Sequence, residues 1–309
     1  MKFSVPIQNY GHPKYPNVAC FVDYVRAVVA ALRQLGHEVV PPTTNGVDVD
    51  RSARPIVFGA QNQHSVDDPR DPGSFLPANA ILYNSEQTGA RGMDPKRIFD
   101  AVKTWRKRVV WDYSEENAKV LRAMGCEHVV HCPVGYHQVM ERITPLPPEK
   151  EDIDVLFYGS VASPESIFGV QKDGITLLDR GRILKDCARA GLNVKHVFGI
   201  YGDKLDTFIA RSKVVLNLHY YEGAVFEIFR CSQLFANKKC VVSEDGGCDD
   251  QLEQLAKRST LYVARKDIVE ACKTLVADQK ARRAQAERGY EVFKEISLTE
   301  NIRQALTQS

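Results

Sequence analysis

The sequence has almost no excess of charge of either sign. Lys and Arg number 41 against 39 Asp and Glu, a net charge of +2, whereas a dedicated nucleic-acid binder usually carries a clear basic excess. Long apolar runs are also lacking. The longest in the first half, residues 27–32, is bounded by Arg26 and Arg33 and is far short of the ~20 residues that a membrane-spanning helix needs. We therefore expect no dedicated nucleic-acid binding and no transmembrane segment.

A secretion signal and a disulfide framework are missing as well. The first nine residues contain no apolar core of the kind that signal peptides have. The eight cysteines are scattered, and several lie inside apolar runs. In a chain without a secretion signal, such cysteines are expected to be reduced, mostly buried thiols. We therefore expect a cytoplasmic protein.

What the sequence does contain is a regular alternation of strand-like and helix-like segments. Short apolar runs are separated by helical patterns of about 10–15 residues, which is typical of parallel sheets with helices on both faces. A length of 309 residues suits two domains of ~150 residues each. The pattern predicts an α/β protein with two Rossmann-like, doubly wound domains facing a cleft.

The proline-rich stretch at 144–153 is the predicted linker, because prolines and charges at this density suit neither a strand nor a helix interior. We predict a first domain at 1–143 and a second at 154–296. Residues 297–309 are predicted to form a separate helix that returns to the first domain, since Ser297 and Glu300 have capping-box spacing. The main predicted elements are strands at 3–7, 38–40, 55–59, 80–84, 108–111, 129–132, 154–160, 194–198, 214–219 and 239–243, and helices at 17–35, 94–106, 114–125, 181–190, 203–211 and 225–236.

The segment from Val214 to Glu244 carries the strongest chemical signal. A buried strand ends near His219, and a glycine turn at Glu222, Gly223, Ala224 and Val225 opens a helix. A helix start presents unpaired backbone N–H groups and a positive dipole end, which suit a phosphate. Glu227, in the predicted first turn, can accept hydrogen bonds from two ribose hydroxyls. The alternative is that Glu227 is only a helix-favouring acid near an N-terminus.

In this segment the sequence resembles nucleotide-sugar glycosyltransferases with the GT-B fold, the group 1, glycogen-synthase-like enzymes and their bacterial relatives. The resemblance rests on residues 226–244 and is supported in order by 82–87, 111–114, 132–136, 154–160 and 198–206. It implies that the second domain binds the donor and the first domain binds the acceptor.

The resemblance also implies roles for individual residues. Glu227 is the expected ribose ligand, and the backbone at 223–225 is expected to face the diphosphate. In retaining members a glutamate stands eight positions before the ribose ligand, and here that position is His219, a candidate catalytic residue. Arg180 and Arg182 lie where the family has a basic residue for the diphosphate, and Arg182 is preferred. Gly159 and Ser160 are expected to bring the backbone close to phosphate.

Two residues of the first domain are candidates for acceptor binding or general base chemistry. His12 follows the first predicted strand and Glu86 follows the strand at 80–84. Both lie at carboxyl ends of parallel strands, where such sheets bind ligands. His12 precedes a proline, so a loop position without chemistry is the alternative.

No metal or other cofactor is expected beyond the donor substrate itself. No Asp-x-Asp pair ends a predicted strand, and the resemblance implies helix dipoles and basic side chains in place of a metal. Cysteine and histidine residues gather at 126–137, but their spacing matches no usual zinc finger or ribbon.

These observations together predict a metal-independent glycosyltransferase that moves a sugar from a nucleotide-diphosphate sugar to a saccharide or other hydroxyl acceptor. Two alternatives stay open at this point. One is a sugar-nucleotide epimerase on the same fold. The other is a two-domain ligand-binding protein without enzymatic activity.

Overall fold

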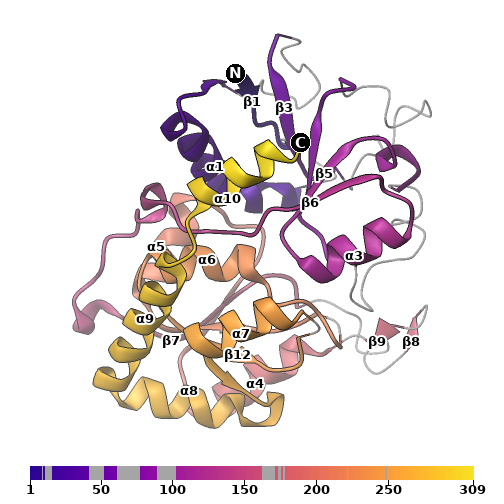
Figure 1. Ribbon diagram of the computed structural model, residues 1–309. Helices are drawn as coiled ribbons and strands as arrows, with labels where there is room; N and C mark the ends of the chain where they lie inside the picture. The colour runs from indigo at the N-terminus through magenta and orange to yellow at the C-terminus, as the bar shows by residue number, and fades with distance from the viewer. Residues whose placement is uncertain are drawn as a thin grey trace. The chain divides into compact units, whose positions relative to one another are not determined.

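The structure is a computed structural model that describes residues 1–8, 10, 16–41, 52–60, 77–88, 102–161, 171–172, 175–176, 178–220, 222–247 and 249–309. The chain divides into two compact units (Figure 1). Unit 1 comprises Met1–Val139 and Ser297–Ser309, and unit 2 comprises Met140–Ile296.

Unit 1 is built on a fully parallel sheet. Its six described strands lie in the order β2-β1-β3-β4-β5-β6. Their bounds are β1 Lys2–Ser4, β2 Glu38–Val40, β3 Arg54–Phe58, β4 Ile81–Asn84, β5 Val109–Asp112 and β6 His128–His131. The order runs to one side of β1 and then to the other, so the direction of winding changes between β1 and β3.

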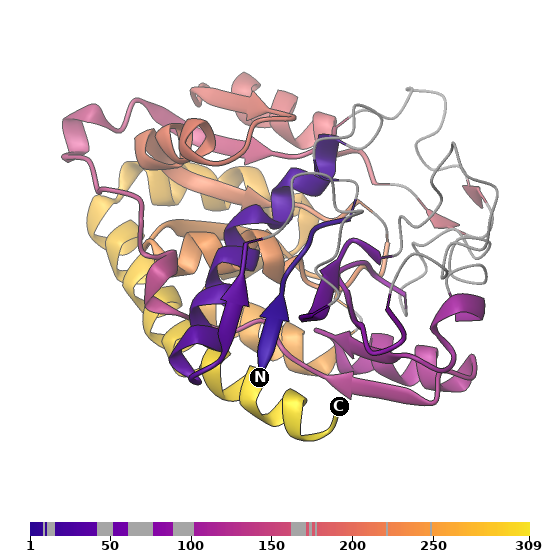
Figure 2. The same cartoon turned by 90° about the horizontal axis from the view of Figure 1, so that it is seen from above.

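Helices pack against the unit 1 sheet. Helix α1 (Val22–Gln34) follows the 3₁₀ helix η1 (Pro16–Phe21), α3 spans Glu115–Ala123, and residues 102–105 are helical. The C-terminal helix α10 (Leu298–Thr307) packs on α1 and carries the C-terminus in Figure 2. A short 3₁₀ helix, η3 (Gln138–Met140), spans the division between the units. The sheet is buried because its apolar residues are covered, as in the cluster of Val57, Ala60, Ala80, Leu82, Val102, Trp105, Val110, Leu121 and Cys126.

Unit 2 repeats the same winding. Its described five-stranded sheet is parallel in the order β10-β7-β11-β12-β13. The strands are β7 Ile153–Tyr158, β10 Val194–Val197, β11 Ser212–Asn217, β12 Cys240–Glu244 and β13 Leu261–Val263, and the short pair β8 Gln171–Lys172 and β9 Ile175–Thr176 stands apart. The helices are α4 Arg180–Arg189, α5 Asp203–Arg211, α6 Ile228–Ala236, α7 Asp250–Ser259, α8 Ile268–Ala277 and α9 Gln279–Lys294, with 3₁₀ helices η4 Pro148–Lys150 and η5 Arg265–Asp267.

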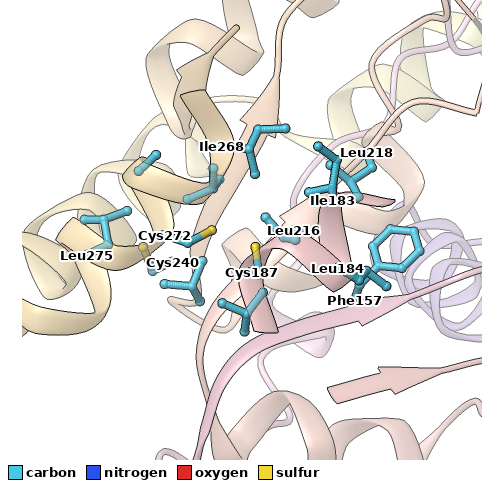
Figure 3. Close-up of a cluster of buried hydrophobic side chains, with 14 of the residues drawn as sticks. Phe157, Ile183, Leu184, Cys187, Leu216, Leu218, Cys240, Ile268, Cys272 and Leu275 are labelled. Carbon is cyan, nitrogen blue, oxygen red and sulfur yellow. The ribbon is translucent and has the colours of Figure 1, made fainter. Parts of the chain in front are cut away.

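Alternate residues of the unit 2 strands face α4 and α8. Figure 3 shows Phe157, Leu216 and Leu218 of the sheet region meeting Ile183 of α4 and Ile268 of α8. The intervening strand residues, such as 156, 215 and 241, are fully buried as well. Burial on both faces explains why these strands read as continuous apolar runs.

The cysteines fit the prediction of buried thiols. Of the seven cysteines in the described ranges, all are free, and six are buried. Cys187 of α4 and Cys272 of α8 lie close together, with their sulfur atoms in yellow in Figure 3. No disulfide joins the described cysteines.

Most of the predicted elements are present within a residue or two. The strand at 38–40 and the helix at 203–211 have the predicted bounds. Ser297 caps α10, as its spacing predicted, by accepting from the backbone N–H group of Glu300, and Ser114 begins the helix predicted at 114–125 by accepting from that of Asn117. The start of the helix predicted at 94–106 lies outside the described residues.

One element begins later than predicted. The helix expected from Val225 starts at Ile228, and Glu227 is its N-cap residue. Ala224 and Val225 are fully buried and Phe226 stacks on Phe235, with ring centroids 6.5 Å apart. This tertiary packing accounts for residues 224–226 lying outside the helix.

The division between the units also precedes the predicted linker. Residues 144–153 belong to unit 2. The backbone N–H groups of Arg142 and Ile143 donate to the side chain of Asn237, and Glu151 pairs with Lys239 and Arg282. These contacts attach the proline-rich stretch to unit 2.

Candidate functional site

Polar and charged side chains of unit 2 gather where the winding of its sheet changes direction. The change lies between β7 and β11, and their carboxyl ends are the residues after Tyr158 and Asn217. In open parallel sheets the carboxyl side of this point is where ligands bind. The strands β7, β11 and β12 and the starts of α4 and α6 all contribute to it.

Gly159 directly follows β7 and needs to be glycine. Its φ is 142°, and a Cβ atom there would lie 3.2 Å from Nη2 of Arg230. Its carbonyl accepts from the ring of His196 at 2.8 Å. The next carbonyl, of Ser160, accepts from Nη1 of Arg180 at 3.2 Å. The backbone at 159–160 therefore lies beside two guanidinium groups.

Arg180 is the first residue of α4, and its side chain is buried. The guanidinium carbon lies 5.5 Å from the ring centroid of Phe157 and 5.1 Å from that of Tyr220. Within the described part of the chain, Nε of Arg180 has no hydrogen-bond partner. Burial lowers the pKa of Arg180, but the neighbouring carboxylate of Glu227 works in the opposite direction.

Glu227 joins Arg180 to Arg230. One carboxylate oxygen lies 2.5 Å from Nη2 of Arg180, and the other lies 2.5 Å from Nη2 of Arg230. Arg230 also donates from Nη1 to Oδ1 of Asn217 at 2.9 Å. Burial by itself raises the pKa of Glu227, but the charges of Arg230 and Arg180 outweigh it and hold the pKa below its ordinary value. Glu227 is therefore ionised at neutral pH.

A second ion pair lies at the end of β12. Glu244 is 1% exposed, accepts the backbone N–H of His219 and pairs with Arg265 of η5. Burial raises the pKa of Glu244, whereas Arg265 lowers it. Arg265 in turn donates to the carbonyl of Asp179, the residue that caps α4. This pair ties η5 and β12 to the start of α4.

His219 is buried at the end of β11. Neither ring nitrogen has a hydrogen-bond partner among the described residues. Burial lowers the pKa of His219 to about 4; Glu227 opposes this shift, and the three arginines add to it. The imidazole is therefore neutral at neutral pH. It lies in a cluster of three guanidinium groups and two carboxylates, which we call the arginine cluster: Arg180, Arg230, Arg265, Glu227 and Glu244.

The structure brings together several of the residues that the sequence pointed to. Gly159, Ser160, His219 and Glu227 all belong to this edge of unit 2. Arg182 does not: its side chain is 78% exposed and pairs with Asp186. Among the loop residues, Glu222 is exposed, Gly223 is half-buried, and Ala224 and Val225 are buried. The backbone at 223–225 does not begin the helix, so the expected helix-start N–H groups belong to the residues after Glu227.

Three residues of this site were not predicted from the sequence: Asn217, Glu244 and Arg265. The first two are the last residues of β11 and β12. A polar residue that ends a buried apolar strand is a usable signal, because the carboxyl end of the strand is where ligands bind. Arg265 offers no such signal, since its partner comes from a distant part of the sequence.

In unit 1, Glu86 lies just beyond β4, as predicted, and its side chain is exposed. Its backbone carbonyl accepts from the amides of Asn84 and Asn117. Both amides also donate to Asp112, at 2.6 and 3.2 Å. A buried polar network therefore holds the turn that presents Glu86. His12, the other acceptor candidate, lies outside the described residues.

The described residues include no group of three or more His, Cys, Asp or Glu side chains that could hold a metal ion. Of the cysteine and histidine residues at 126–137, His128 is exposed, and His131 contacts the carbonyl of Tyr113 and the carboxylate of Glu115. None of the helices in the described ranges is long and apolar enough to cross a membrane.

Known structures share this fold. Anabaena HepE in complex with UDP and glucose aligns with a TM-score of 0.61 at 12% identity, over 100% of both chains. T4 phage BGT in complex with UDP-glucose aligns with a TM-score of 0.56 at 12% identity, over 100% of this chain and 97% of that one. Sucrose-phosphate synthase from Thermosynechococcus elongatus gives 0.55 at 13% identity, over 100% and 98%. Curated protein sequences gave no match.

A match between the sequence and a family profile shows which family the chain belongs to. The profile described as "Glycosyl transferase-like" matches residues 142–307, more than half of the chain and the whole of the arginine cluster. The match favours glycosyl transfer over the epimerase and the binding-protein alternatives. With two doubly wound units of the GT-B type, the chain belongs to the glycosyl transferase-like family and is a glycosyltransferase.

Proposed function

We propose that the enzyme transfers a sugar from a nucleotide-diphosphate sugar to a hydroxyl acceptor, and that unit 2 binds the donor diphosphate at the arginine cluster. The observation that carries this proposal is an imbalance of charge. Among the described residues, three guanidinium groups face two carboxylates, which leaves one positive charge without a carboxylate at the ligand-binding edge of the sheet. A donor diphosphate supplies the negative charge that balances it.

The chemistry of glycosyl transfer explains why the charge lies there. As the bond between sugar and diphosphate breaks, negative charge grows on the leaving phosphate oxygen. Guanidinium groups held in place by buried partners stabilise that charge without rearranging, and they match phosphate geometry with paired N–H donors. The N-terminus of α6 adds a positive dipole end. Because these groups supply the positive charge, we propose that transfer needs no divalent cation.

Uridine diphosphate sugars are the first donors to test, since HepE and T4 BGT were crystallised with UDP or UDP-glucose. For the acceptor, we propose a saccharide or other hydroxyl compound bound by unit 1. Glu86 is the proposed contact or general base, because the network of Asn84, Asp112 and Asn117 fixes its turn while its side chain stays exposed.

Calorimetric titration of UDP, GDP, ADP and CMP into the full chain tests the donor site. Arg180→Ala should weaken binding of the best nucleotide by about tenfold or more, because charge-assisted hydrogen bonds contribute roughly 1.5–3 kcal/mol each. Arg182→Ala, on the same helix, should change the affinity little. Turnover of the matching nucleotide sugar with a saccharide panel should persist in EDTA.

Three results count against this proposal. Loss of affinity in Arg182→Ala with unchanged affinity in a folded Arg180→Ala would return the diphosphate to the residue that the sequence favoured. A chain that binds none of the nucleotides would remove the donor site altogether. Loss of turnover in EDTA, restored only by Mg²⁺ or Mn²⁺, would contradict metal independence.

A further inference from the structure

Glu227 uses both of its carboxylate oxygens on arginine. Oε1 contacts Arg180 and Oε2 contacts Arg230, each at 2.5 Å. A ribose ligand, by contrast, needs the carboxylate to accept from two hydroxyl groups. In the structure, therefore, Glu227 holds the position of an anion bound between two guanidinium groups.

The helix does not need this carboxylate. Glu227 is the N-cap residue of α6, but its side chain makes no capping hydrogen bond, and the first turn of α6 contains no acidic residue. The other helix start at this edge is different, because Asp179 caps α4 with its side chain. The contacts of the Glu227 carboxylate in the described chain are thus the two arginines.

The surrounding groups are suited to an anion with more oxygen atoms than a carboxylate has. Within the described residues, Nε of Arg180 and both ring nitrogens of His219 have no hydrogen-bond partner, and both side chains are buried. Buried polar groups are normally hydrogen-bonded. A diphosphate offers more acceptors than the single carboxylate that now lies among them.

Glu227 is also somewhat more exposed than the two arginines that it contacts. Its side chain is 19% exposed, against 6% for Arg180 and 12% for Arg230. The carboxylate is therefore in partial contact with solvent, from which an anion can reach it.

We propose that Glu227 is an internal counter-anion: its carboxylate holds Arg180 and Arg230 together in the free enzyme and is displaced by the diphosphate of the donor. This inference rests on the proposed donor site. It makes Glu227 a positioning residue that keeps two buried guanidinium groups ionised and close together until substrate arrives. It also predicts that the carboxylate competes with the ligand.

Inorganic pyrophosphate is the probe, because it has no ribose and so does not report on any ribose contact of Glu227. Calorimetric titration compares the wild-type chain with Glu227→Gln, which keeps the size of the side chain and removes its charge. Removing the competing carboxylate should tighten pyrophosphate binding by about tenfold or more. The free variant has no charge-assisted pair between Glu227 and the arginines that must be broken before the anion binds. The matched control is Asp245→Asn, which removes a negative charge from an exposed residue just beyond β12; its pyrophosphate affinity should stay within about twofold of wild type.

A Glu227→Gln variant that is unstable in isolation still gives an answer. Pyrophosphate should then raise its melting temperature by more than it raises that of the wild-type chain, because the anion replaces the missing carboxylate. Unchanged or weaker pyrophosphate binding by the variant, with no larger rise in melting temperature, overturns the inference. A wild-type chain on which pyrophosphate and nucleotides do not compete overturns the donor site itself, so the two failures are distinguishable.

Discussion

Single residues at the arginine cluster explain why the charged groups can be buried there. Arg180, Arg230 and Glu227 are each shielded from water, but each has an oppositely charged or aromatic neighbour, such as Phe157, whose ring lies 5.5 Å from both guanidinium carbons. Removing one partner from a buried pair leaves an uncompensated charge, which is usually strongly destabilising. His219 differs from these residues, because it avoids the cost of burial by staying neutral.

The neutral state of His219 gives a prediction about pH. Its pKa is about 4 in the folded chain, against ~6.5 in an unfolded chain. As the pH falls below 6.5, the unfolded state binds a proton that the folded state does not, so the folded state loses stability. Between about pH 7.5 and about pH 5 the loss from this residue amounts to roughly 2 kcal/mol of the free energy of unfolding.

Urea denaturation of His219→Gln at both pH values measures this contribution. The variant should lose about 2 kcal/mol less than the wild-type chain on acidification. His128→Gln is the control, since His128 is exposed, and it should follow the wild type. Equal losses in all three proteins would mean that His219 does not resist protonation in the fold.

The sequence alone did not show which of the two arginines of α4 is buried at the site. Arg180 and Arg182 are two positions apart, so on a helix their side chains point roughly 200° apart and only one can face the sheet. The sequence does not fix which one does, because the start of α4 follows residues 162–177, which form no clear pattern. The capping contact of Asp179 sets the helix start in the structure, and Arg180 becomes the buried member.

At the scale of elements, capping signals were the most reliable guide. Ser114 and Ser297 are N-cap residues, and the side-chain oxygen of each accepts from the backbone N–H group three residues later. The start of α6 was less predictable, because burial of Ala224 and Phe226 overrides local helix preference. Strand β13 was not predicted, because it has only three residues and all of them are half-buried, which gives no strong apolar run.

Close packing between helices of unit 2 gives a second prediction. Gly289 of α9 lies against the end of α7, and a Cβ atom there would be 2.7 Å from the carbonyl oxygen of Ser259 and 3.2 Å from the ring of Phe235. Backbone cannot move aside as a flexible side chain can. Gly289→Ala should therefore lower the free energy of unfolding by roughly 1–3 kcal/mol, measured by urea denaturation.

Gly181→Ala in α4 is the matched control. Its Cβ would have ordinary contacts, with Oδ1 of Asp179 at 3.4 Å and Cβ of Val161 at 4.0 Å. Because alanine favours helix over glycine, this change should leave stability unchanged or raise it by up to about 1 kcal/mol. If Gly289→Ala is as stable as this control, the contact between α9 and α7 is looser than the structure indicates.

For the whole molecule, the alternation of strands and helices was sufficient to predict two parallel, doubly wound units. Both sheets have their first strand between the second and the third, so each changes winding direction at the same place in its order. Spacing could have indicated the pair of Glu227 and Arg230, which are three residues apart, but not the pairs that join α4 to α6 and β12 to η5. Only the folded sheet brings these residues to one edge.

Amide hydrogen exchange of the full chain tests the central claim most directly, with and without a saturating amount of the nucleoside diphosphate that binds most tightly. If unit 2 binds the donor at the arginine cluster, protection should increase at residues 158–160 after β7, at 217–220 after β11 and at 228–231 at the start of α6. These segments carry the backbone beside Arg180, His219 and Arg230. Protection confined to unit 1, with these three segments unchanged, would contradict the assignment of the donor site.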